Sequence, residues 1–103
     1  MKKPVLLLVV LILGSAPIGT AVSANAIERA CNQSNRQAAS RQLCGCIGLV
    51  ADMTLSGTDQ RQAARFFSDP QRAQDIRMSD RASDEAFWTR YRSFGETAEA
   101  MCG

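Results

Sequence analysis

Four cysteines are the residues of this sequence with the clearest chemistry. They are Cys31, Cys44, Cys46 and Cys102, and the chain contains no histidine. Without histidine it lacks the usual general base and the usual imidazole ligand of metals. This excludes Ser-His-Asp catalysis, Cys-His catalysis and any metal site ligated by histidine. We therefore expect no enzymatic activity, no catalytic residue, no metal site and no cofactor.

The number and spacing of the cysteines predict two disulfides. Cys44 and Cys46 point about 200° apart around a helix, so each should bond a more distant cysteine. We favour Cys31 with Cys44 and Cys46 with Cys102, because Cys46 and Cys102 both fall on apolar faces of predicted helices. The swapped pairing, Cys31 with Cys46 and Cys44 with Cys102, stays open, since the closed loops hardly differ in length between the two schemes.

The segment Cys44-Gly45-Cys46 has two other interpretations. Two thiols one residue apart can form a strained, oxidising disulfide and so take part in thiol-disulfide exchange. They could also bind Cu(I), with Met53 or Met101 nearby. However, Arg41 is the one nearby cation that could lower a thiolate pKa, and the spacing lacks the two chelating pairs of a zinc site. Structural disulfides are the favoured hypothesis.

Residues 1–24 have the layout of a secretory signal peptide. Lys2 and Lys3 precede an apolar run over residues 5–13, and small residues follow as far as Ala24. The apolar run is about half as long as a membrane-spanning helix requires. We expect cleavage after Ala24, with cleavage after Ala26 as the alternative, and a mature protein that is periplasmic or secreted.

Cleavage changes the charge of the chain. Lys2 and Lys3 are its only lysines, so the mature chain, residues 25–103, has equal numbers of arginines and acidic residues and no net charge. A neutral chain with interspersed charges creates no field that attracts nucleic acid or anionic lipid. We expect neither as a partner of the mature chain, and an envelope protein or a small ligand stays open.

The mature chain is predicted to be a single all-α domain, a small bundle of four to five helices stapled by the disulfides. Apolar residues recur every three or four positions, and runs of β-branched residues are absent. Caps and helix breakers predict helices over Ala26–Gln33 and about 36–55, a third with Thr58 as N-cap, a fourth after Asp69-Pro70 and a fifth near Ser83.

Apolar stripes on these helices indicate which residues form the core. The stripe of the second helix comprises Leu43, Cys46, Ile47, Val50, Met53 and Thr54. The stripe of the last helix comprises Phe87, Trp88, Tyr91, Phe94, Ala98 and Met101. Because the aromatic residues begin at Phe66, the C-terminal half should supply most of the core.

Many arginines lie three or four residues from an acid. The predicted pairs are Arg72 with Asp69 and Asp75, Arg77 with Asp80, Arg81 with Asp84 and Glu85, and Arg92 with Glu96. Such pairs are typical of solvated helix faces and are individually weak. The alternative is a docking surface for an acidic partner or a carboxylate ligand, formed by Arg61, Arg65, Arg72, Arg77 and Arg81.

Four blocks of the sequence resemble a family of small exported bacterial four-cysteine helical proteins. The blocks are residues 29–34 (RACNQS), 43–47 (LCGCI), 64–77 (ARFFSDPQRAQDIR) and 87–95 (FWTRYRSFG). Members of this family are often labelled "arginine transporter". A transporter needs several spans of about 20 apolar residues, and none follows residue 24. The resemblance implies no catalytic or binding residue and at most an accessory part in arginine transport.

These observations predict an exported, non-enzymatic binding or interaction protein of the bacterial envelope. The first alternative is a periplasmic thiol-disulfide or Cu(I)-handling protein that uses Cys44-Gly45-Cys46. The second is an accessory component linked to arginine transport.

Overall fold

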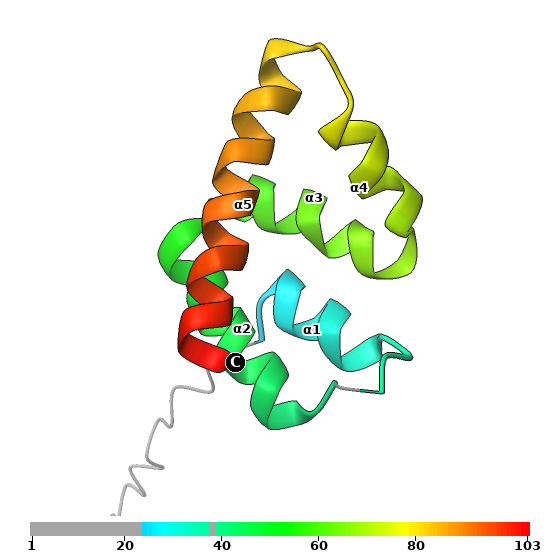
Figure 1. Cartoon of the computed structure of the whole chain (residues 1–103). Coiled ribbons are helices and arrows are strands. Elements are labelled where there is room, and N and C mark those ends of the chain that lie inside the picture. Colours follow the sequence, from blue (N-terminus) through cyan, green and yellow to red (C-terminus); the bar gives the residue numbers. More distant parts are fainter. Residues whose placement is uncertain (1–23, 38) are drawn as a thin grey trace, which may run out of the picture.

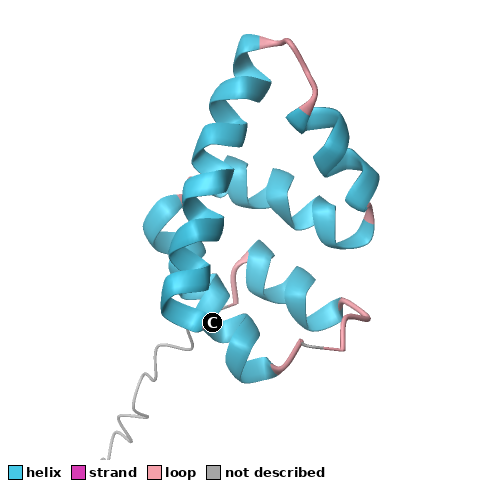
Figure 2. Cartoon of the chain, viewed as in Figure 1, coloured by secondary structure: helices cyan, strands magenta, loops and turns pink. Residues whose placement is uncertain are grey.

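The computed structural model describes residues 24–37 and 39–103, in which all regular secondary structure is α-helical (Figures 1 and 2). The helices are α1 (Ala26–Gln33), α2 (Arg41–Thr54), α3 (Gly57–Ser68), α4 (Pro70–Arg77) and α5 (Ala82–Cys102). The predicted all-α bundle with two disulfides is confirmed. Except for Ala24, the predicted signal peptide lies outside the described residues. Within those residues, no helix is both long enough and apolar enough to cross a membrane.

Side-chain caps set where the first three helices begin. The side-chain oxygens of Asn25, Ser40 and Ser56 accept hydrogen bonds from the backbone N–H groups three residues later, at 2.8, 3.0 and 3.1 Å. Each bond satisfies one of the amides that a helix leaves without a partner in its first turn. The bounds predicted for α1 are confirmed, as are Asp69 and Pro70 as N-cap and first residue of α4.

Two predicted helix starts are wrong. Serines at unexpected positions cap α2 and α3, so α2 starts at Arg41 instead of near residue 36, and Ser56 replaces Thr58 as the N-cap of α3. The predicted start of the last helix near Ser83 is confirmed, because α5 begins at Ala82. There the Ser79 hydroxyl accepts a hydrogen bond from the Arg81 N–H and donates one to Asp84, at 3.1 and 2.7 Å, which organises the turn before the helix.

The helix α5 runs along one side of the molecule (Figure 1). Its C-terminal half lies beside α2, and its N-terminal half lies beside α3 and α4. The short helix α1 packs on both α2 and α3. Both ends of the described chain therefore pack against α2, through α1 and through the end of α5.

Apolar residues from four helices and the segment after α2 form the core. The buried cluster consists of Ile27, Val50, Ala51, Leu55, Ala63, Phe66, Phe87 and Phe94. The Phe66 ring meets the edges or faces of Phe87 and Tyr91, at centroid distances of 5.9 and 5.1 Å. The helices α3, α4 and α5 supply all the aromatic rings, four of the eight residues in this cluster and eight of the nine partly buried residues packed against it, as predicted for the C-terminal half.

Two methionines of the predicted stripes do not belong to the core. Met53 is 65% exposed and Met101 is 56% exposed. On α2 the buried face is rotated, because this helix packs on α1 through Cys44 and Gly48 as well as on α5. At the end of α5, Cys102 and not Met101 turns toward α2, since it forms a disulfide there.

A polar network joins α1, α2 and α3 beside the core. The Asn25 amide nitrogen donates hydrogen bonds to the Gly48 carbonyl at 2.8 Å and to an Asp52 carboxylate oxygen at 3.0 Å. The buried Gln60 amide donates to the same carboxylate oxygen at 3.1 Å. Asp52 thus accepts hydrogen bonds from Asn25 before α1 and from Gln60 of α3. Asn25, which caps α1, therefore also holds α1 against α2.

Candidate binding cleft

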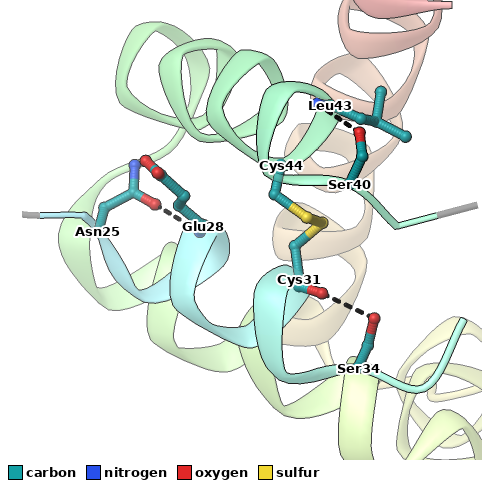
Figure 3. Close-up of a disulfide and its surroundings, with 7 residues drawn as sticks. All are labelled: Asn25, Glu28, Cys31, Ser34, Ser40, Leu43 and Cys44. Carbon is teal, nitrogen blue, oxygen red and sulfur yellow. Dashed lines mark hydrogen bonds between the residues drawn. A yellow bond between two sulfur atoms is a disulfide. The ribbon is translucent and has the colours of Figure 1, made fainter.

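Two disulfides anchor both ends of the chain to α2. Cys31 of α1 bonds Cys44, with an S–S distance of 2.05 Å, a Cα–Cα distance of 5.5 Å and both residues buried (Figure 3). Cys46 bonds Cys102 at the end of α5, with a Cα–Cα distance of 5.8 Å. This is the favoured pairing. Helix geometry explains why Cys44 and Cys46 bond different partners, because residues two apart on α2 point toward opposite neighbours. The packing of α1 and α5 on α2 decides which partner each cysteine takes.

The two disulfides occupy the cysteines on which the thiol-disulfide and Cu(I) interpretations depend. Cys44 and Cys46 bond different partners, and no free cysteine occurs in the described part of the chain. Neither sulfur is therefore a thiolate in this arrangement. Nor does any group of three or more His, Cys, Asp or Glu residues that could hold a metal ion occur among the described residues.

A cleft of about 710 Å³ lies between the end of α1, the segment that follows it, and the junction of α3 with α4. Its lining consists of Ala30, Gln33, Ser34, Asn35, Arg36, Ala64, Arg65, Phe67, Ser68 and Pro70. Its volume lies within the range of about 300–1,000 Å³ that is usual for ligand sites.

The wall formed by residues 33–36 is tied to the helices at both ends. The Cys31–Cys44 disulfide closes the loop that contains it, and the Cys31 carbonyl accepts hydrogen bonds from both the N–H and the hydroxyl of Ser34, the latter at 2.7 Å (Figure 3). The Ala39 N–H donates to the Arg36 carbonyl at 3.0 Å, which adds a turn to the segment. The disulfide therefore positions one wall of the cleft as well as stapling α1 to α2.

Positive charge dominates the cleft. Among the described residues that line it, Arg36 and Arg65 are the charged ones, and none is an aspartate or glutamate. The Arg36 guanidinium lies over the Phe67 ring, 5.2 Å from its centroid, which holds the cation at the cleft by a cation–π contact. Within the described residues, neither arginine is within ion-pair distance of a carboxylate.

The five arginines of the predicted docking surface are all exposed. Of these, Arg65 lines the cleft, whereas Arg61, Arg72, Arg77 and Arg81 do not. Arg61 is instead engaged within its own helix, where it donates a hydrogen bond to the Thr58 hydroxyl at 3.3 Å. Arg36, which sequence reasoning did not single out, joins Arg65 because the chain folds back after α1.

The predicted arginine–carboxylate pairs are mostly not formed. Among the described residues, the pair Arg92–Glu96 approaches to 4.0 Å, and those predicted for Arg72, Arg77 and Arg81 are not within that distance. The closest ion pair is instead Arg90 with the buried Asp59, at 2.6 and 3.1 Å, which ties α5 to the first turn of α3. The Asp59 hydrogen bond raises the pKa of Arg90, which remains a cation.

Two smaller cavities flank other parts of α2. One of about 390 Å³ is lined by both Glu28 and Arg41, so its charges oppose each other. The other, of about 300 Å³, adjoins Cys46, Cys102 and Met101 and has no charged lining residue. Of these three cavities, the cleft beside Arg36 and Arg65 is the largest, and it is the one whose charged lining residues are all positive.

Comparison with protein-family models, with curated proteins and with solved structures finds no match to this chain. The site is therefore interpreted from its own geometry.

Proposed function

We propose that this protein is an exported, non-enzymatic helical binding module of the bacterial envelope, and that the cleft between α1 and α3 is its binding site. The observation that carries the proposal is a ligand-sized cleft whose two guanidinium groups lack carboxylate partners among the described residues. Two arginines that share one cleft can serve as recognition groups, because their planar donors suit carboxylates and other oxyanions.

The two disulfides support export. Disulfides persist in oxidising compartments such as the periplasm and the extracellular space, and are rare in the cytosol. Both join elements far apart in sequence, with separations of 13 and 56 residues, so they contribute to the tertiary fold. Together with the signal-peptide pattern, they support a periplasmic or secreted location.

The contacts of Asn25 support cleavage after Ala24. Asn25 caps α1 and bonds to α2, and Ile27 is fully buried. Cleavage after Ala26 would remove the cap and place a charged α-ammonium group on Ile27, next to the core. Cleavage after Ala24 keeps every side-chain contact of Asn25.

Site-specific photo-crosslinking in living cells tests the proposal. A photoreactive residue at Gln33, inside the cleft, is expected to give an adduct of defined mass. The same residue at Gln74, an exposed position on α4 outside the cleft, is the matched control. Adding Ser68→Trp, which fills the cleft, should abolish the Gln33 adduct. Equal adducts from both positions, an adduct that survives Ser68→Trp, or no adduct at all would contradict the proposal.

The arrangement does not favour the two alternative functions. A thiol-disulfide or Cu(I)-handling role needs Cys44 and Cys46 together as thiolates, whereas they belong to separate disulfides. Arg36 and Arg65 suit the carboxylate of free arginine, but the guanidinium of that ligand would lie in the same cleft beside both arginines, with no lining carboxylate among the described residues to receive it. Calorimetric titration of the protein with free arginine is therefore expected to show no heat of binding.

A further inference from the structure

The composition of the cleft indicates what it binds. Resting on the proposed function above, we infer that the cleft takes an acidic peptide segment of a partner protein, with a carboxylate next to an apolar side chain. The charge of the cleft supports an anionic ligand, its apolar lining supports an apolar side chain beside the anion, and its size supports a peptide.

The charges specify an anion. The mature chain has no net charge, yet the cleft lining holds Arg36 and Arg65 and no acid. Both side chains are exposed, and Arg36 is already held over Phe67. A guanidinium that is held in place loses less conformational freedom when it binds a carboxylate than a free one does.

The apolar lining residues of the cleft indicate that the bound anion has an apolar group next to it. Ala30, Ala64, Phe67 and Pro70 line the cleft together with the two arginines and the amides of Gln33 and Asn35. The Ser34 and Ser68 hydroxyls already donate to backbone carbonyls, so the guanidinium and amide groups supply the donors that remain. A fully polar anion would leave the Phe67 ring and the alanines without a partner.

The size of the cleft favours a peptide segment over a small acid. A single carboxylate occupies a small part of about 710 Å³. Two arginines, one on the segment after α1 and one on α3, can engage carboxylates on successive side chains of one extended segment. A small monocarboxylic acid bears one such group.

The test is a titration followed by amide NMR of the exported, oxidised protein. The probe is a capped peptide of alternating glutamate and leucine, and the matched controls are the same peptide with glutamine for glutamate and sodium phenylacetate as a small acid. The acidic peptide is expected to shift the amides of Ala30, Gln33 and Ala64. It should bind more weakly as salt is added, because added ions screen the attraction.

Paired variants identify the residues responsible. Arg36→Gln with Arg65→Gln is expected to weaken peptide binding roughly tenfold, the effect of losing two partly exposed charged contacts. Arg77→Gln with Arg81→Gln removes the same charge outside the cleft and should leave affinity unchanged. Thermal unfolding of both variants confirms that they are folded.

The outcomes separate this inference from the proposed function. Equal binding of the glutamine peptide, shifts confined to other surfaces, or no shift with any probe overturns the acidic ligand. Phenylacetate binding as tightly as the peptide overturns the peptide assignment. A further outcome is that the photoreactive residue at Gln33 crosslinks a partner in cells and that Arg36→Gln with Arg65→Gln leaves this adduct intact. That result would support the proposed binding function and overturn the inference that the ligand is acidic.

Discussion

Tyr91 is the one tyrosine of the chain and lies within the aromatic cluster. Its ring packs against Phe66, Phe87, Trp88 and Phe94, with centroid distances of 5.1–5.9 Å. Burial raises the pKa of its phenol above the ordinary 10.0, and the positive charge of Arg36 lowers it by a smaller amount. Tyr91 therefore reports on both the core and the charge at the cleft.

This side chain predicts how stability changes at alkaline pH. Because the folded pKa of Tyr91 is raised, the unfolded chain loses the phenolic proton first, so the free energy of unfolding is unaffected below about pH 10 and falls as the pH rises through the folded pKa. Phenolate absorbance measures the titration directly, since Tyr91 is the one tyrosine of the chain. Denaturant unfolding at a series of pH values measures the stability.

Two variants control this prediction. Tyr91→Phe should remove both the absorbance change and the pH-dependent loss assigned to this group. Arg36→Gln should raise the pKa of Tyr91 further, because it removes the cation that favours the phenolate. A Tyr91 titration at the ordinary value in the folded protein would show that the ring is not buried as described.

Single residues also show where sequence reasoning fails. Arg90 and Asp59 are 31 positions apart, so no local spacing pairs them, and the exposed arginine pairs that spacing does suggest are mostly not formed. Weak surface pairs do not hold long side chains against the entropy of ordering them. The Arg90–Asp59 pair forms because Asp59 is buried between packed helices and needs a partner.

At the level of helices, α1 and α2 meet at a glycine. A Cβ added to Gly48 would lie 2.9 Å from the Glu28 Cβ, closer than packed atoms come. Gly95, in the middle of α5, has no heavy atom within 4 Å of its ideal Cβ position. These two of the helical glycines therefore differ in packing while sharing the same cost to helix formation.

Alanine substitutions at these glycines should have opposite effects. Gly95→Ala is expected to raise the free energy of unfolding by about 0.5–1 kcal/mol, because alanine favours the helix and meets open space. Gly48→Ala should lower it by about 1–2 kcal/mol, since overpacking at the α1–α2 contact outweighs the same gain. Urea denaturation of the two variants beside the parent protein measures both. Stabilisation by Gly48→Ala would mean that the helices do not approach this closely.

The helices themselves follow largely from local sequence. α1 begins at Ala26 and α4 begins at Pro70, as the sequence predicts. The start of α2 is not local, because residues 36–39 could extend a helix. A longer α2 would remove the segment that lets the chain reverse and bring Cys44 within 5.5 Å (Cα–Cα) of Cys31.

For the whole molecule, the disulfides compensate for a small core. Ile27, Val50 and Cys44 are its largest fully buried side chains, and several aromatic rings remain partly exposed. Loop-closure entropy assigns about 3 kcal/mol to Cys31–Cys44 and about 4 kcal/mol to Cys46–Cys102. Their sum is comparable with the total stability of a small domain.

Removing the disulfides should therefore unfold the domain. We expect replacement of all four cysteines by serine to abolish cooperative unfolding, measured by circular dichroism. Cys46→Ser with Cys102→Ser should cost more than Cys31→Ser with Cys44→Ser, because it opens the longer loop. Cys31→Ser with Cys44→Ser should additionally weaken ligand binding, because the wall of the cleft formed by residues 33–36 is then no longer closed by a disulfide. A four-serine variant with undiminished stability would contradict this role.

The sequence by itself predicts an all-helical domain with two disulfides, and residues 25–103 contain no lysine and carry no net charge, because residue composition, apolar periodicity and cysteine spacing are local or countable properties. It does not determine the cleft. Arg36 and Arg65 belong to segments that meet only when the chain reverses after α1 and packs on α3, and the reversal is held by Cys31–Cys44. Long-range packing decides which of ten similar arginines lack a carboxylate and share a cleft, because that depends on distances between helices and not on positions along one.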